Sequence, residues 1–184
     1  MSHRREQERG DRPLKDRFAP MRLSEREVPA GEAEGILASG EYGVLSVSGD
    51  GGYPYGVPVN YAYSDGIIYI HHTNAGSLLT DMLSSGDKVC FTVVSRSEVL
   101  PEMFTDAYES VIVFGTAAVS EDIEGPLRSI GKKYSPGLGE RMEEHIRGAA
   151  GRCLIIAVKV EHLTGKRRPR TAPEKTGEVP RKGF

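Results

Sequence analysis

The stretch YGVPVNYAYSDGIIYIH, residues 55–71, decides how the middle of this chain folds. From Tyr55 to Tyr63, tyrosine and valine side chains alternate with small, proline or amide ones, which is typical of a strand with one buried face. Asp65 and Gly66 form a two-residue hairpin signal, because both central positions of such a turn favour positive φ. The apolar run Ile67–His71 is the expected return strand. The stretch therefore predicts an antiparallel β-hairpin.

The pattern on either side of this hairpin is also mostly strand. Gly115 interrupts one apolar run, which indicates a bulge or a close backbone approach, and the acidic stretch 95–109 is assigned to a loop. With the hairpin, six strands are expected, and they predict a mainly β (α+β) fold built on a small antiparallel barrel with short helices. The four further strands are predicted at Tyr42–Val47, Lys88–Val94, Ser110–Val119 and Arg152–His162, and short helices at 30–37, 76–85, 122–134 and 140–147.

Length and composition suit one soluble domain between two charged ends. With 184 residues, 38% of them hydrophobic, the chain can bury a single core. No apolar stretch approaches the roughly 20 residues of a membrane span, and none follows the charged N-terminus, so we expect a cytoplasmic protein that does not enter the membrane. A net charge of −2 gives no indication of nucleic-acid binding. We divide the chain into a charged arm at 1–20, a domain at 21–165 and a basic tail at 166–184.

Two features of the sequence point to a ligand, and each has a plainer interpretation. The segment Thr73–Ser77 joins a strand end to a helix start, where free backbone N–H groups bind phosphate. Simple helix capping by Asn74 or Ser77 is the commoner explanation of such a segment. Pro54 and Pro58 remove hydrogen-bond donors from an otherwise good strand. That strand lies either at the edge of a sheet or against a flat heterocyclic ligand.

Metal chemistry has no support in the sequence. His71 and His72 are neighbours on a strand, so their side chains point to opposite faces and cannot chelate one ion together. The histidines and cysteines show no zinc-binding spacing. Cys90 and Cys153 lie inside apolar runs, which is typical of buried structural thiols.

Several segments, taken together, resemble one family of proteins. These are GYPYGVPVNYAYSDGIIYIHH, DKVCFTVV, YESVIVFG, KYSP and EHLTGK, which occur in matching order between about Met21 and Lys166. They are similar to the Nim-type 5-nitroimidazole reductases, a branch of the pyridoxamine 5'-phosphate oxidase-like FMN-binding split barrels. The resemblance implies a six-stranded antiparallel split β-barrel and a homodimer with flavin sites at the subunit interface.

The resemblance also implies a set of site residues. The isoalloxazine ring of FMN would lie along the strand that carries the two prolines, with His71 beside it as the catalytic proton donor. Two residues would reach the flavin from the partner subunit. Related proteins have basic residues at the helix start where this chain has Ser77 and Leu78, which takes charge-assisted contacts away from the phosphate. The implied cofactor-binding residues are Val57, Pro58, Val59, His71, His72, Thr73, Gly76, Ser77, Leu78, and, across the interface, Tyr108 and Ser110.

The implied activity is an FMN-dependent oxidoreductase. Electrons from NAD(P)H would pass through the flavin to a small aromatic acceptor, either a nitro compound or a quinone-like one. Pyridoxamine-phosphate oxidation itself is disfavoured, because its basic substrate contacts are not recognisable in this chain. The alternatives are a deazaflavin-dependent reductase and a flavin- or haem-binding carrier or sensor without catalysis.

Overall fold

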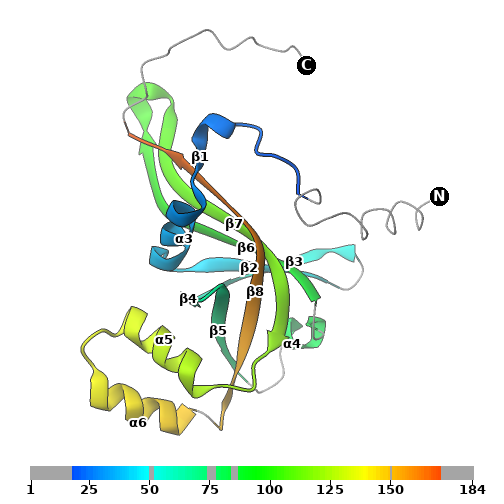
Figure 1. Ribbon diagram of the computed structural model, residues 1–184, viewed down its shortest axis with the longest axis vertical. Coiled ribbons are helices and arrows are strands. Elements are labelled where there is room, and N and C mark those ends of the chain that lie inside the picture. The colour runs from blue at the N-terminus through cyan, green and yellow to red at the C-terminus, as the bar shows by residue number, and fades with distance from the viewer. Residues whose placement is uncertain (1–17, 50–51, 74–77, 84–86, 150, 171–184) are drawn as a thin grey trace, which may run out of the picture.

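A computed structural model of the chain describes residues 18–49, 52–73, 78–83, 87–149 and 151–170. Within these residues the strands form one antiparallel sheet in the order β3-β2-β6-β7-β8-β5-β4, with β1 pairing β8 (Figure 1). The strands are β1 Glu27–Val28, β2 Gly43–Ser48, β3 Pro54–Val59, β4 Ala62–Ser64, β5 Ile67–Thr73, β6 Asp87–Leu100, β7 Thr105–Val119 and β8 Cys153–Arg168. The helices are η1 Ser24–Arg26, α3 Ala30–Ser39, α4 Leu78–Met82, η3 Pro101–Met103, α5 Glu124–Tyr134 and α6 Gly139–Ala149.

The predicted fold class, mainly β with an antiparallel sheet and short helices, is confirmed, but the described residues contain eight strands rather than six. The prediction of a single strand over 55–63 is wrong. After Val59 the chain leaves β2 and resumes as β4, which pairs with β5 at the opposite end of the strand order. Between the two strands, the Tyr61 N–H donates to the hydroxyl of Tyr134 (3.0 Å) instead of to a neighbouring strand. The hydroxyl of the fully buried Tyr61 side chain in turn donates to the carbonyl of Leu37.

The predicted hairpin turn is confirmed. Asp65 and Gly66 have φ values of 52° and 78°, and Ser64 pairs with Ile67 on either side of them. Glycine has no Cβ to oppose positive φ, and aspartate tolerates it better than most residues. The local sequence therefore sets this turn without help from the rest of the fold.

Three strands are longer than predicted. β6 and β7 continue through 95–109, the stretch assigned to a loop, and form a hairpin that projects from the barrel (Figure 1). Because the outer part of this hairpin is largely exposed to solvent on both faces, its side chains show no alternation to detect. β8 continues to Arg168, so the first three residues assigned to the tail, Lys166, Arg167 and Arg168, pair with β7.

Two apolar clusters hold the elements together. The larger one fills the inside of the curved sheet and includes the α3 residues Ala33, Ile36 and Leu37. The smaller one lies between the far ends of β5 and β8 and the helix pair α5–α6. Cys153 belongs to the smaller cluster as predicted, whereas Cys90 is only partly buried. No helix in the described part of the chain is long and apolar enough to cross a bilayer.

Candidate functional site

The central strands carry an outward surface that we call the open face. Strand register places Ser46, Cys90, Phe114 and His162 in one row across β2, β6, β7 and β8. Their neighbours along the strands, such as Leu45 and Val113, point inward and are fully buried. The open face is exposed or half-buried throughout, with Ile112 at 42% and Phe114 at 38% exposure. Its members are Val44, Ser46, Gly56, Pro58, Cys90, Thr92, Ile112, Phe114, His162 and Thr164.

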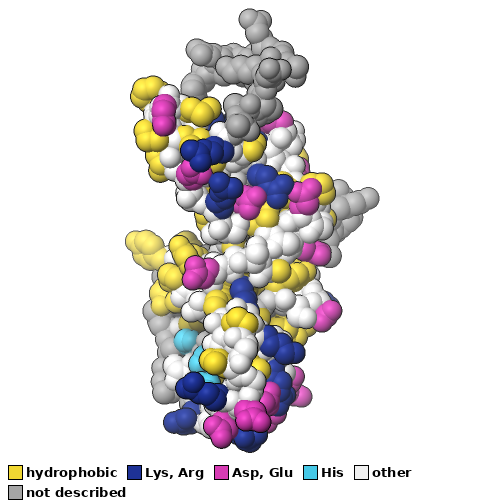
Figure 2. All heavy atoms as spheres, turned by 90° about the vertical axis from the view of Figure 1, so that its left-hand side faces the viewer, with side chains coloured by type: hydrophobic (Ala, Val, Ile, Leu, Met, Phe, Trp, Pro, Cys, Tyr) yellow, Lys and Arg dark blue, Asp and Glu magenta, His cyan; other side chains and the backbone are white. Residues whose placement is uncertain are grey.

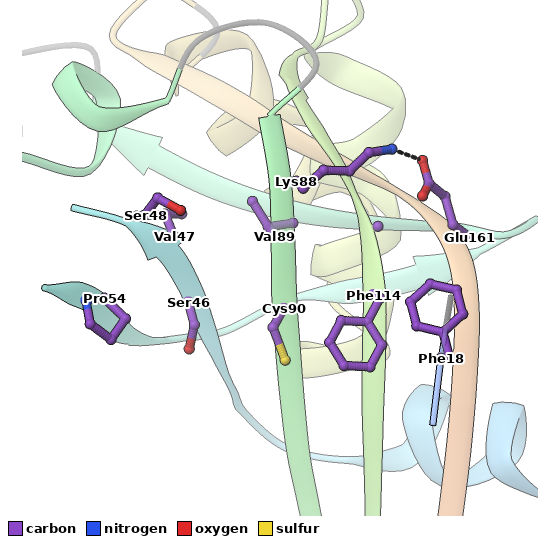
Figure 3. A pocket seen from close by; sticks show the side chains of 11 residues that line it. Phe18, Ser46, Val47, Ser48, Pro54, Lys88, Val89, Cys90, Phe114 and Glu161 are labelled. Atoms are coloured by element: carbon purple, nitrogen blue, oxygen red, sulfur yellow. Dashed lines mark hydrogen bonds and ion pairs between the residues drawn. The ribbon is translucent and has the colours of Figure 1, made fainter. Parts of the chain in front are cut away.

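A pocket of about 420 Å³ lies at one end of this face. Its volume falls within the range of small-molecule sites, and most of its wall is apolar. Phe18, from the segment before η1, stacks on Phe114, with centroids 5.0 Å apart (Figure 3). The same ring stacks on His162, with centroids 4.1 Å apart. The lining residues are Phe18, Ser46, Val47, Ser48, Pro54, Lys88, Val89, Cys90, Phe114, Gly115 and Glu161.

One side of the pocket is polar because of a bulge in β8. Phe114 pairs with His162 and Gly115 with Val160, so Glu161 is the extra residue. Bulges of this kind re-aim a side chain, and Glu161 here accepts from Lys88 and from Thr116 (Figure 3 shows the ion pair). A Cβ on Gly115 would lie 2.4 Å from the carbonyl oxygen of Lys159, so glycine is needed for this approach. The expectation of a bulge or close approach at this glycine is confirmed.

The strand with the two prolines borders the pocket. β3 ends the strand order and has β2 as its neighbour, so the prediction of an edge strand is confirmed. Pro54 and Pro58 both point outward and are exposed, and Pro54 lines the pocket. Of the predicted flavin contacts on β3, Pro58 belongs to the open face, while Val57 and Val59 are half-buried against the inner cluster.

The predicted site residues on β5 lie elsewhere. His71 and His72 occupy opposite faces, as expected for strand neighbours: His71 pairs with Ile155 on the side of α5 and α6, and His72 pairs with Leu154 on the inner side. Burial, together with the like charges of His145 on α6 and of His72, lowers the pKa of His71 below its ordinary value. Thr73 ends β5 and is exposed.

Residues 74–77, which connect β5 to α4, are not among the residues that the structure describes. They include the predicted site residues Gly76 and Ser77, whereas Leu78 begins α4, whose Leu79 is buried in the larger cluster. The described residues contain no group of three or more His, Cys, Asp or Glu side chains placed to hold a metal ion.

The predicted partner-side residues lie on β7, beyond the pocket. Ser110 and Tyr108 project from the same side of β7 as Ile112 and Phe114. They lie on the part of β7 that leads into the projecting hairpin. The hydroxyl of Tyr108 accepts a hydrogen bond from Arg26 Nη1 at 3.4 Å. The structure thus leaves the described members of the predicted site on β3, β5, α4 and β7, and none of these described residues lines the pocket.

Sequence reasoning missed the pocket residues for two reasons. Phe18 stands among charged residues, and nothing local indicates that it packs on a sheet. Phe114 and His162 could have been assigned to an outward face from strand alternation, but their meeting depends on the β7–β8 register, which the bulge shifts.

Comparison with known proteins places this arrangement in a family. The model of a family described as Pyridoxamine 5'-phosphate oxidase matches residues 29–167. No curated protein matches the sequence.

Solved structures with similar folds share little sequence with the chain. A candidate 5-nitroimidazole antibiotic resistance protein from Bacteroides thetaiotaomicron is 21% identical with a TM-score of 0.59, covering 77% of this chain and 86% of that one. The flavocytochrome Anf3 from Azotobacter vinelandii is 18% identical with a TM-score of 0.70, covering 89% and 78%. An FAD- and haem-binding protein from Mycobacterium smegmatis is 16% identical with a TM-score of 0.66, covering 82% and 76%. At these identities the likeness concerns the fold, whereas the family model spans most of the sequence, and the chain therefore belongs to the pyridoxamine 5'-phosphate oxidase family.

Proposed function

We propose that the protein binds FMN on its open face, beside β3, and passes electrons from NAD(P)H to a small nitroaromatic or quinone-like acceptor. The observation that carries this proposal is the edge strand β3, whose exposed prolines border a mostly apolar pocket in a chain of this family. The names of similar structures, which include FAD-binding proteins and a nitroimidazole resistance protein, favour the same chemistry.

The residues on the open face suit a flat aromatic ring. Gly56 and Pro58 leave little side-chain bulk on β3. Val44 on β2 and Ile112 on β7 add apolar side chains to the same face, with Thr92 of β6 between them. Backbone groups on the free side of β3 are available to hydrogen-bond a heterocycle, because an edge strand pairs on one side only. A bound flavin would supply hydride and electron transfer, and the protein would orient the ring and shield it from water.

Two experiments in sequence test flavin binding. The first is the visible spectrum of the purified protein before and after titration with FMN, for which we expect uptake of one FMN per chain. The second uses Gly56→Leu, which fills the space above β3. A Cβ at Gly56 would make only ordinary contacts with Val44 and Ser46, so the variant should fold. We expect its FMN affinity to fall at least tenfold, while Gly31→Leu, at an exposed position of α3, binds normally. Equal affinity in both variants would place the ring elsewhere.

We also propose that two copies associate through the open face, so that the flavin sites lie at the interface between them. The exposed apolar side chains on this face, Ile112 and Phe114, would be removed from water between two copies. The matching test compares Ile112→Glu with Leu138→Glu by light scattering, since both side chains are exposed, at 42% and 45%, but Leu138 precedes α6 and is not part of the open face. We expect only Ile112→Glu to yield a monomer.

We also propose His71 as the proton donor to the reduced acceptor, which requires the acceptor to extend from the open face to β5, because His71 does not line the pocket. Its lowered pKa leaves it mostly neutral at pH 7, so a donor role predicts turnover that rises as the pH falls toward that pKa. His71→Ala should lower turnover and remove this rise without changing FMN uptake. If His71→Ala has the turnover and the pH profile of wild type, His71 is not the proton donor.

The names of two similar structures favour a second candidate function, a haem-binding carrier or sensor. The same spectrum separates it from a flavoprotein or a deazaflavin protein, because the three chromophores absorb differently. A Soret band on haem addition without any FMN uptake would favour the carrier.

A further inference from the structure

We propose that Arg26, Lys166, Tyr108 and Ser110 form a binding site for the phosphoryl group of a nucleotide. That the nucleotide is a flavin or a nicotinamide rests on the proposed function; the anion site itself does not. These four residues, which we call the Tyr108 cluster, come from segments far apart in the sequence.

Three elements bring the cluster together. β1 pairs with β8, with Val28 opposite Gly165, and this pairing positions Arg26 at the end of η1 beside the outer part of the sheet (Figure 1). On the other side of β8, Lys166 pairs with Ser110 of β7. Arg26 Nη1 donates to the Tyr108 hydroxyl at 3.4 Å, and Lys166 Nζ lies 5.8 Å from the centre of the Tyr108 ring. All four residues are half-buried.

No carboxylate among the described residues forms an ion pair with the two cations of the cluster. Glu27, which is opposite Lys166 in register, is exposed and does not bridge to it. The next residue on β8 behaves differently: Arg167 contacts Glu32 at 2.6 Å and Glu109 at 2.8 Å. Figure 2 shows how closely basic and acidic side chains otherwise alternate on one side of the molecule.

The phenol of Tyr108 responds to these cations. Burial raises the pKa of Tyr108, but hydrogen bonds from Arg26 and Lys166 and their positive charges outweigh it, so the pKa lies below its ordinary value. Two half-buried cations beside two hydroxyl groups offer the charge-assisted donors that a phosphate dianion needs. Removing such cations partly from water is unfavourable unless an anion accompanies them.

The cluster is suitably placed for a nucleotide on the open face. Ser110 at the cluster and Phe114 at the pocket project from the same side of β7, four residues or about 13 Å apart at about 3.3 Å per residue. A ring near the pocket and a phosphate at the cluster would span this distance. The helix start at Ser77 and Leu78 has no basic residue in the sequence, so a phosphate must find its cations elsewhere.

Isothermal titration with inorganic pyrophosphate tests the anion site directly. We expect wild type to bind it, and Arg26→Gln and Lys166→Met each to lose at least tenfold in affinity. Lys166→Arg should keep most of the binding because it preserves the charge. Lys159→Met is the matched control, since Lys159 is an exposed lysine on the same strand. Absence of binding to wild type, or an equal loss in Lys159→Met, would overturn the proposal. Thermal melting of each variant establishes that it is folded.

Two further measurements identify the source of the phosphoryl group. If it belongs to the flavin, Arg26→Gln and Lys166→Met weaken FMN binding at least tenfold but leave riboflavin, which lacks the phosphate, unchanged. If it belongs to the nicotinamide nucleotide, FMN binding is unchanged and the KM for NAD(P)H rises instead. Should the wild-type protein bind no flavin at all, the proposed function fails, while the pyrophosphate titration still decides the anion site.

Discussion

The ring of Phe18 lies on the imidazole of His162 with centroids 4.1 Å apart and planes 4° from parallel. This stack joins the segment before η1 to the open face and closes one side of the pocket. It also covers Phe114, whose ring centroid lies 5.0 Å from that of Phe18. The segment leading into the domain is therefore part of the pocket wall.

Replacing Phe18 by alanine should open the pocket and weaken the fold slightly. Each aromatic pair contributes about 0.5–1.5 kcal/mol beyond area burial, so we expect the free energy of unfolding to drop by about 1–3 kcal/mol in urea denaturation. Phe104→Ala is the control, because Phe104 is 98% exposed. Equal stability of the two variants would show that the stack contributes nothing in solution.

Replacing Gly115 by alanine should damage both stability and the pocket. The new methyl would clash with the Lys159 carbonyl and with Val158, and the bulge that presents Glu161 would have to shift. Overpacking of this kind costs about 1–3 kcal/mol. Gly35→Ala serves as the control, because that glycine is at an exposed position of α3, and an added Cβ would meet nothing within 4 Å. Helix propensity predicts a gain of about 0.5–1 kcal/mol for this variant. Thermal melting of both variants measures the difference, and a melting temperature of Gly115→Ala at or above wild type would contradict the clash.

Lys133 should make stability depend on pH in the alkaline range. Its Nζ is buried without a hydrogen-bond partner in the described structure, and it lies 3.7 Å from the centre of the Tyr61 ring. Burial lowers the pKa of Lys133 from 10.5 to about 8. Between these values the unfolded chain holds the proton and the folded one has largely lost it, so stability rises with pH across this window.

The variant Lys133→Met removes this titration. We expect it to be more stable than wild type at pH 7 and to show a flatter stability profile between pH 8 and 10.5, whereas Lys132→Met on the exposed side of α5 keeps the wild-type profile. Attraction to the Tyr61 ring opposes the effect of burial. If the stability of wild type and of Lys133→Met depends on pH in the same way, attraction to the Tyr61 ring keeps Lys133 protonated in the folded chain.

The environment of His71 predicts a titration shift that NMR can follow. Burial is the main cause of its lowered pKa, and the neighbouring charges of His145 and His72 add to it. His145→Gln should therefore raise the pKa of His71 part of the way toward its ordinary 6.5, while the more distant His162→Gln leaves it unchanged. An unchanged pKa of His71 in His145→Gln would mean that the charge of His145 does not reach His71.

The same shift affects stability at acidic pH. The pKa of His71 is lower in the folded chain than in the unfolded one. The stability that neutral His71 allows is therefore complete above the unfolded-state pKa, and it is lost as the pH falls through the folded-state pKa. Wild type should therefore lose stability below about pH 6.5, and His71→Gln should lose less. Urea denaturation between pH 7 and pH 5 checks this difference.

Local sequence determined the elements whose conformation depends only on neighbouring residues. The turn at Asp65 and Gly66 follows from which residues tolerate positive φ. The edge position of β3 follows from prolines that cannot donate to a second strand. Matching segments in matching order indicated the family, which the family model confirms over residues 29–167.

Tertiary structure alone decided the break at Tyr61 and the composition of the pocket. The alternation of 55–63 continues through that break, because the side-chain pattern does not record which strand the backbone pairs with. The pocket and the Tyr108 cluster each join residues from separate strands and from the segment before β1. Their meeting depends on register, and in β7 and β8 the register is shifted by a bulge. A shift of one residue reverses the face on which every following side chain lies, and that is why no local pattern could place them.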